Sequence, residues 1–138
     1  MHYPLKFSPE DGDIVVTSRD FPELLTAAAT DEVALAMAED ALEVVLLTYA
    51  EKGQALPAVR HPEEDERIVF VRPHIAAKLL VIQAFEDAGI AKSELARRMD
   101  IGENEARRIL DPNHGTKLDK LYQASLALGK RLVVDLAA

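Results

Sequence analysis

The amino-acid sequence predicts an α+β protein, with strands concentrated in its first half and helices in its second half. Three observations support this prediction. Apolar and polar residues alternate near the N-terminus, apolar residues recur at helical spacing after residue 30, and further helical patterns begin at residue 73. We therefore expect a β-β-β-α-β domain over residues 1–72, followed over residues 73–138 by a helical domain with a C-terminal strand.

A hairpin is expected at the N-terminus. Residues 2–7 alternate between apolar and polar side chains, and residues 13–18, DIVVTS, are rich in β-branched side chains. The sequence SPEDG between them combines a proline that presets φ with a glycine that permits a reversal. A third strand is expected at residues 24–27 and a fourth at residues 67–71.

A long helix separates the third and fourth strands. Thr30 is its expected N-terminal cap, Asp31 and Glu32 suit the positive end of the helix dipole, and Gly53 follows the last turn. The residues expected to face the sheet recur at helical spacing: Val33, Met37, Ala41, Val44, Val45 and Thr48. The helix is apolar beyond this one face, and we expect the excess to contact another subunit.

The second half begins near residues 72–74, because Pro73 favours the first position of a helix. After this helix, two short helices are expected at residues 92–99 and 103–110, joined by the turn DIG. A last helix follows, with Thr116 as its expected cap.

The two short helices have the spacing of a helix-turn-helix, whose second helix enters the major groove of DNA. Ala96 and Ala106 are small enough to let the helices cross closely, and Ile101 fills the corner. Asn and Arg pair with adenine and guanine edges. The expected DNA contacts are Lys92, Ser93, Asn104, Arg107 and Arg108, with Thr116 and Lys117 on phosphates. The alternative is a structural helical hairpin, since helical bundles also contain short amphipathic helices.

Some residues depart from the common form of this motif. Ala91 is a poor cap for the first helix, and Asp100 stands where glycine is common, although Asp tolerates positive φ. Glu103 and Glu105 open the expected recognition helix, where a carboxylate repels phosphate. Glu103 either accepts a hydrogen bond from a cytosine amine or only stabilises the helix N-terminus, and we favour the second role.

The segment RLVVDL at residues 131–136 has the composition of a strand. A lone strand after helices leaves its backbone groups unpaired. We therefore expect it to pair with the same strand of a second copy, which would present two recognition helices about one DNA turn, ~34 Å, apart. The expected dimerisation residues are Arg131, Leu132, Val133, Val134, Asp135 and Leu136. The alternative is that this strand joins the chain's own sheet.

The net charge of −8 is distributed unevenly along the chain. Residues 1–72 contain 6 Lys or Arg and 15 Asp or Glu, a balance of −9, whereas residues 73–138 contain 10 and 9, a balance of +1. The acidic first half is either a solvated surface or a face for a basic partner.

Several kinds of chemistry lack support in the sequence. There are no cysteines, and the four histidines are far apart, so no disulfide or metal site is expected. Phosphate-binding and nucleophile motifs are absent, and the acids of the first turn, around Asp11, are typical of a solvated turn. No signal peptide or membrane-length apolar segment is present. We expect a cytoplasmic protein without enzymatic activity or cofactor.

The order of these segments resembles the HicB antitoxin family. The stretch from MHYPLKF through GDIVVTSRDFPELLTAAATDEVALAMAEDALEVVL, followed by SELARRMDIGENEARRIL and HGTKLDKLYQASLALGKRL, covers nearly the whole chain. VVTSRDFPE is similar to the strand and D-x-P signature of the family, and TDEVALAMAEDAL is similar to its long helix. The DNA-binding half resembles the helix-turn-helix type, where other members carry a ribbon-helix-helix.

The resemblance implies an N-terminal domain like a trimmed ribonuclease H fold that binds a small basic toxin of the HicA type. Such a toxin has a double-stranded-RNA-binding-like fold and cleaves mRNA with a histidine. The antitoxin covers it, and the C-terminal domain represses the antitoxin's own operon, commonly as a dimer or larger oligomer. The expected toxin contacts are Asp11, Asp13, Asp20, Phe21, Pro22 and Glu23.

Two other hypotheses remain at this stage. A stand-alone helix-turn-helix repressor would sense a small molecule in a pocket between sheet and long helix, but the expected core is nearly all aliphatic. A residual nuclease would cleave RNA with a metal ion, but the necessary converging carboxylates are not evident.

Overall fold

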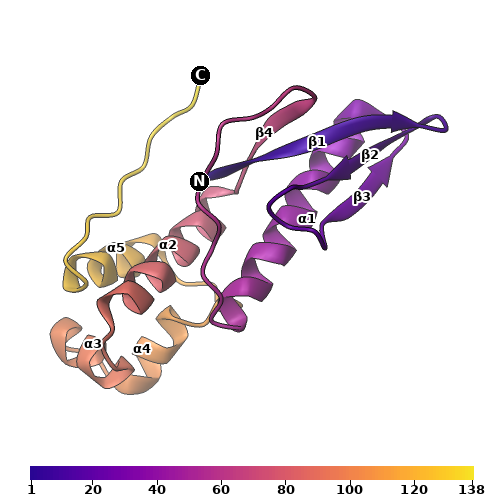
Figure 1. Ribbon diagram of the computed structural model, residues 1–138. Helices are drawn as coiled ribbons and strands as arrows, with labels where there is room; N and C mark the ends of the chain where they lie inside the picture. The colour runs from indigo at the N-terminus through magenta and orange to yellow at the C-terminus, as the bar shows by residue number, and fades with distance from the viewer. The chain divides into compact units, whose positions relative to one another are not determined.

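The computed structural model describes all residues from Met1 to Ala138 and confirms the mixed α+β class (Figure 1). The chain divides into two units, Met1–Pro73 and His74–Ala138. The first unit contains a four-stranded antiparallel sheet in the order β3-β2-β1-β4, with one long helix on its face. Its elements are β1 (His2–Glu10), β2 (Asp13–Thr17), β3 (Leu25–Ala28), α1 (Asp31–Glu51) and β4 (Glu66–Phe70).

The first hairpin is tighter than expected. Strand β1 continues to Glu10, and only Asp11 and Gly12 form the loop, with φ values of 50° and 87°. A two-residue loop with positive φ at both positions matches the twist of the flanking strands. The expectation that the strand ends at residue 7 is therefore wrong, because Pro9 lies within the strand, opposite Ile14.

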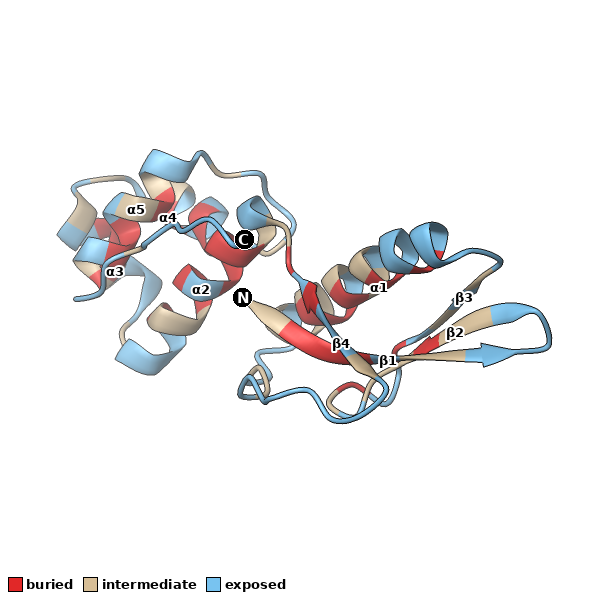
Figure 2. Ribbon diagram, turned by 90° about the horizontal axis from the view of Figure 1, so that it is seen from above, coloured by how far each residue is buried: buried red, intermediate tan, exposed pale blue.

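Alternate residues of the sheet form the core of the first unit. Tyr3, Leu5 and Val16 are buried and lie on one face of the sheet, by their alternation and register. Figure 2 shows the buried parts of β1 and β2 and the long helix α1 beside the sheet. The aromatic ring of Phe21 is fully buried, 5.1 Å from the ring of Tyr3 and 5.3 Å from the ring of Tyr49, in edge-on contacts. These contacts join β1, the loop after β2 and the C-terminal part of α1.

Helix α1 faces the sheet with a different side from the one expected. Its buried residues are Ala34, Ala38, Leu42, Val45 and Leu46. Of the expected inward residues, Val45 is buried, but Val33, Met37 and Val44 are exposed. Moving one residue along a helix turns the side chain by about 100°, and both series of residues are apolar. The small side chains of Ala34 and Ala38 fit close to the sheet, which the spacing alone did not reveal.

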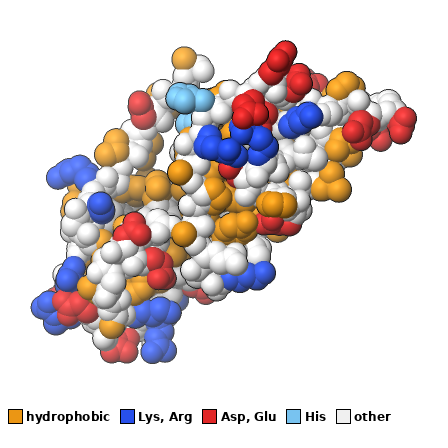
Figure 3. Space-filling model, viewed as in Figure 1, with side chains coloured by type: hydrophobic (Ala, Val, Ile, Leu, Met, Phe, Trp, Pro, Cys, Tyr) orange, Lys and Arg blue, Asp and Glu red, His pale blue; other side chains and the backbone are white.

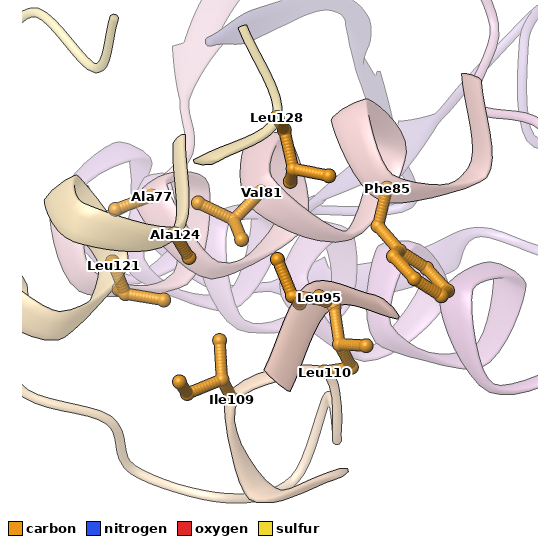
Figure 4. Packing of buried hydrophobic residues seen from close by; sticks show 9 residues of the cluster. All are labelled: Ala77, Val81, Phe85, Leu95, Ile109, Leu110, Leu121, Ala124 and Leu128. Carbon is orange, nitrogen blue, oxygen red and sulfur yellow. The ribbon is translucent and has the colours of Figure 1, made fainter. Parts of the chain in front are cut away.

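The second unit consists of four helices around one apolar cluster. They are α2 (Pro73–Ala88), α3 (Lys92–Met99), α4 (Glu103–Ile109) and α5 (Leu118–Ala127). Every helix contributes to the cluster, which Figure 4 shows from close by; its members are Ala77, Val81, Phe85, Leu95, Ile109, Leu110, Leu121, Ala124 and Leu128. Short helices such as α3 and α4 are marginal alone, so this packing holds them in place.

At the end of the chain, the expected cap of α5 is wrong, and the alternative for the C-terminal segment is not observed. Thr116 does not cap α5, because the capping position is Lys117 and it makes no side-chain capping bond. Residues 131–136 form no strand in the single chain and pair with none of its four strands. The alternative in which this segment joins the chain's own sheet is therefore not observed. No helix combines the length and the apolar character that crossing a membrane requires.

Candidate nucleic-acid interface and partner surface

Helices α3 and α4 meet in the geometry of a helix-turn-helix. Asp100 ends α3 in the left-handed conformation, with φ 56° and ψ 48°. The backbone N–H of Ile101 then donates to the carbonyl oxygen of Ala96 at 3.0 Å, which closes the end of the helix. Ala96 and Ala106 are buried where the two helices pack. These residues occupy the structural roles that the spacing predicted.

The outer face of α4 carries most of the expected base-contacting residues. Asn104, Arg107 and Arg108 are exposed. Glu103 lies 3.9 Å from Arg107, one turn along the helix, and Glu105 pairs with Lys120 of α5 at 3.2 Å. Both carboxylates therefore lie close to cations of the same unit, and both belong to the first turn of the helix, where acids are favourable.

The arginines of α3 are held by a carboxylate of the same helix. Glu94 accepts hydrogen bonds from Arg97 and Arg98, and these two guanidinium groups lower the pKa of Glu94 to about 2. Arg98 also donates to the carbonyl oxygen of Ala127 at 3.1 Å. Of the expected contacts near this helix, Lys92 and Ser93 are exposed at its first turn.

A buried lysine behind α4 was missed by the sequence analysis. Lys78 of α2 is 3% exposed, and its amine donates to the carbonyl oxygens of Arg108 and Ile109 and to the hydroxyl of Thr116. Burial lowers the pKa of Lys78 to about 8, against the opposing charge of Asp111. Its position in the sequence could have indicated its burial. Lys78 lies three residues after Ile75 and four before Ile82, so it falls on the apolar stripe of α2.

Thr116 and Lys117, expected as phosphate contacts, have different surroundings. The hydroxyl of Thr116 is partly buried and accepts the hydrogen bond from Lys78. Lys117 is exposed just before α5. Of the two, Lys117 is the exposed one and carries a positive charge, whereas the hydroxyl of Thr116 already binds Lys78.

The loop after β2 places two of the expected partner contacts inside the first unit. The side chain of Asp20 is only 7% exposed and pairs with Arg60 at 2.7 Å. The backbone N–H groups of Asp20 and Phe21 both donate to the hydroxyl of Ser18. The buried ring of Phe21 packs in the aromatic contacts described above, so it offers no surface to a partner. Pro22 and Glu23 remain exposed.

All four arginines of the first unit are paired with acids, including Arg60 with Asp20. Arg19 binds Glu63 and Glu66, Arg67 binds Asp31, and Arg72 approaches three acids of α1. By contrast, no arginine pairs with the exposed acids around the first hairpin loop, where Figure 3 shows acidic side chains gathered at the end of β1 and β2. These acids are Glu10, Asp11 and Asp13. The excess negative charge of the unit is therefore exposed.

The last residues of the chain leave apolar side chains in solvent. Leu132 packs against the apolar cluster, and its backbone N–H donates to the hydroxyl of Ser125 at 3.1 Å. Beyond it, Val133 and Val134 are exposed, and Leu136 is 93% exposed. An open hollow of about 260 Å³ lies beside this segment and is lined by residues of α2, α5 and the segment itself, including Leu80, Val81, Ala84, Leu132 and Val133.

No group of acidic, histidine or cysteine side chains gathers in a way that could hold a metal ion. The carboxylates of the sheet are either paired with arginine or lie at the hairpin loop. The arrangement can bind charged partners, and it presents no evident nucleophile or acid–base pair.

The chain is similar to antitoxins of bacterial toxin–antitoxin systems. Residues 2–80 match the family described as HicB_like antitoxin of bacterial toxin-antitoxin system. The chain is 36% identical to Antitoxin HicB 1 of Photorhabdus laumondii over 137 residues, which cover 99% of this chain and 87% of that protein. It is 33% identical to Antitoxin HicB of Escherichia coli K12, over 96% of each chain. It is 29% identical to Antitoxin HicB of Pseudomonas fluorescens, over 99% of this chain and 94% of that protein.

Proposed function

The chain belongs to the HicB-like antitoxin family, and from this premise we propose that it masks a small basic mRNA-cleaving toxin and represses its own operon. The similarity along the full length to proteins named Antitoxin HicB carries this proposal. Residues 1–72 bind the toxin, and residues 73–138 bind operator DNA and a second copy. Both activities take place in the cytoplasm, where mRNA and operator DNA are accessible, and neither requires a cofactor or catalysis by this chain.

Charge supports the assignment of the first unit to the toxin. The balance of −9 over residues 1–72 complements a protein whose surface binds RNA phosphates. The exposed acids Asp11 and Asp13 of the hairpin loop, with Glu23, are the charged candidates for this contact. Asp20 and Phe21 contribute indirectly, because they hold the loop that carries Pro22 and Glu23.

An apolar stripe on α1 supplies a second part of the toxin surface. It consists of Val33, Met37 and Val44, which lie along one side of the helix, away from the sheet, and Val44 is 64% exposed. Asp40 lies on the same side and pairs with Arg72 at 2.7 Å. An apolar centre within an acidic surface is the arrangement that a protein partner with a basic rim would bury.

DNA binding by the second unit follows from the exposed face of α4. Asn104, Arg107 and Arg108 read base edges, while Lys92, Ser93 and Lys117 contact phosphates. The similarity to the family profile ends at residue 80, so this part of the proposal depends on the helix-turn-helix geometry and on the full-length relatives.

Dimerisation through residues 131–136 completes the proposal. The segment pairs with no strand of its own chain and leaves its valines exposed, and an antiparallel ribbon with a second copy satisfies both its backbone and its apolar side chains. The hollow beside Leu80 and Leu132 provides apolar surface that the second copy covers. The two α4 helices then address half-sites of a palindromic operator.

Co-expression with the product of the adjacent gene tests the toxin assignment. We expect a basic partner to co-purify with the full-length chain and its mRNA cleavage to stop in the complex. An unrelated basic RNA-binding protein of similar size is the control, because simple charge attraction would retain it as well. The proposal would be contradicted if the control protein co-purified as well as the toxin, or if mRNA cleavage continued in the complex.

A further inference from the structure

We propose that Lys78 is a positioning residue for DNA recognition, which holds the C-terminal end of α4 at the angle that the major groove requires. This inference rests on the proposed DNA-binding function. Lys78 cannot contact DNA itself, because its side chain is 3% exposed. It acts through the backbone of the residues whose side chains point outward.

The contacts of Lys78 converge on the segment that follows the recognition residues. Its amine lies 3.1 Å from the carbonyl oxygen of Arg108, 2.7 Å from that of Ile109 and 2.5 Å from the hydroxyl of Thr116. These three acceptors account for all three N–H groups of an ammonium ion. One side chain of α2 thus joins the last turn of α4 to the segment leading into α5.

A lysine at this position is not needed for packing. The residues near it in α2 include Ala77, Leu79, Val81 and Ile82, all apolar and buried. An unbranched apolar side chain such as methionine would fill similar space without the cost of removing an ammonium ion from water. The lysine therefore has a role that a hydrophobic side chain could not fulfil, and its geometry identifies that role as holding backbone carbonyl groups.

Lys78 binds two carbonyl groups at the C-terminal end of α4, and that of Arg108 also accepts the backbone N–H of Asp111 at 3.2 Å. The last four carbonyl groups of a helix accept no hydrogen bond from an N–H group of the same helix, and α4 has only seven residues. Apolar contacts at Ile109 and Leu110 limit how far the helix can move from the core, but they are non-directional. The directional contacts of Lys78 define the rotation and tilt of α4. Arg107 and Arg108 lie within one turn of the anchored end, so their reach into a groove depends on it.

The absence of cysteine allows the amine to be tested chemically. Lys78→Cys can be alkylated in denaturant with 2-bromoethylamine, which restores an ammonium ion at the same length, and then refolded. Alkylation with 1-bromopropane gives a neutral side chain of the same length and serves as the matched control. Lys78→Met and Thr116→Val are the genetic counterparts, and the second removes one acceptor without introducing a new group into α2.

Four quantities are measured for each full-length protein: affinity for the chain's own promoter, affinity for unrelated duplex DNA, the salt dependence of both, and the thermal midpoint. We expect the propyl and Met proteins to lose about tenfold or more in promoter affinity, as expected from losing charge-assisted hydrogen bonds. Affinity for unrelated DNA and the salt slope should stay unchanged, because a buried amine releases no counterions. The aminoethyl protein should regain the promoter affinity, and Thr116→Val should show a smaller loss in the same direction.

The outcomes separate this inference from the function on which it rests. If the unmodified chain does not prefer its promoter to unrelated DNA, the proposed DNA-binding function fails. If the unmodified chain has this preference and the propyl protein retains it in full, the positioning role of Lys78 is refuted. If Lys78→Met does not fold, the comparison of aminoethyl with propyl protein and the Thr116→Val variant decide the question. Equal losses for promoter and unrelated DNA would also overturn the inference.

Discussion

Arg19 and Glu66 form a two-point ion pair that joins the end of β2 to the start of β4. Their hydrogen bonds measure 2.7 Å and 2.6 Å, and the carboxylate of Glu66 is nearly buried. Strand β1 lies between β2 and β4 in the sheet, so this ion pair connects two segments that are not hydrogen-bonded neighbours. The same carboxylate accepts the backbone N–H of Glu63.

Replacing Glu66 with Gln should destabilise the first unit. The guanidinium group of Arg19 lowers the pKa of Glu66, so the folded value lies below the unfolded value. The stabilisation is present above the unfolded pKa and disappears as pH falls through the folded pKa. We expect Glu66→Gln to cost about 1–2 kcal/mol at pH 7 and much less at strongly acid pH. Urea denaturation of both proteins at the two pH values measures this, and an equal difference at both would contradict the assignment.

Glu94 should limit the contribution of α3 to DNA affinity. It holds Arg97 and Arg98, whose guanidinium groups lower the pKa of Glu94 to about 2. Glu94→Gln releases the two arginines, so we expect tighter binding to any duplex DNA and a steeper decrease of affinity with salt. The stabilising effect of Glu94 is present above its unfolded pKa and is lost as pH falls toward 2. Salt titration of DNA binding, with Glu86→Gln as a charge-matched control, checks the prediction.

Arg107 and Arg108 should carry base recognition if α4 enters the groove. Arg107→Ala and Arg108→Ala are each expected to weaken promoter binding by about 1–3 kcal/mol at physiological salt. Lys52→Ala removes a cation from the first unit and is the control that should leave promoter binding unchanged. Electrophoretic or fluorescence titrations with promoter and unrelated DNA distinguish base contacts from phosphate contacts. Unaltered promoter binding in both variants would exclude this face of α4.

The apolar stripe of α1 should bind the toxin. Met37→Lys together with Val44→Lys places two charges in the proposed interface, where they repel a basic partner and remove apolar contact area. We expect a loss of affinity of at least about tenfold, with little effect on folding because both side chains are exposed. Ala55→Lys introduces the same kind of charge in the exposed loop after α1 and should have a smaller effect. Calorimetric titration with the toxin measures the difference in affinity. If the double variant binds the toxin normally but self-associates less than the unmodified chain, the stripe contacts a second copy and not the toxin.

The terminal segment should determine the oligomeric state. Val133→Asp with Leu136→Asp places charges where a paired ribbon would bury apolar side chains. Sedimentation equilibrium should show a dimer for the unmodified chain and monomers for the variant, with promoter affinity falling in parallel. Ala138→Asp adds a charge beyond the expected strand and is the control. A variant that remains dimeric would place the interface elsewhere.

Particular residues show how far the sequence analysis reached. The helix-turn-helix was located correctly, because Ala96, Asp100 and Ala106 satisfy requirements that depend on nearby residues. The prediction of which side of α1 faces the sheet was wrong, because Val33 and Ala34 are both apolar and the spacing did not distinguish between them. Phe21 looked like part of an exposed loop, yet its pocket is formed by Tyr3 and Tyr49, which are distant in sequence.

The sequence by itself determined the order of strands and helices as far as α5, the family, and the separation of a strongly acidic half from a nearly neutral one. These properties depend on local backbone preference, periodicity and composition, which neighbouring residues specify. The tertiary structure alone decided which face of α1 meets the sheet, which loop residues are removed from the surface, and which amine supports α4. Each of these depends on side chains brought together from distant parts of the chain, such as Lys78 and Thr116. A pattern within a short stretch of sequence carries no information about such long-range contacts.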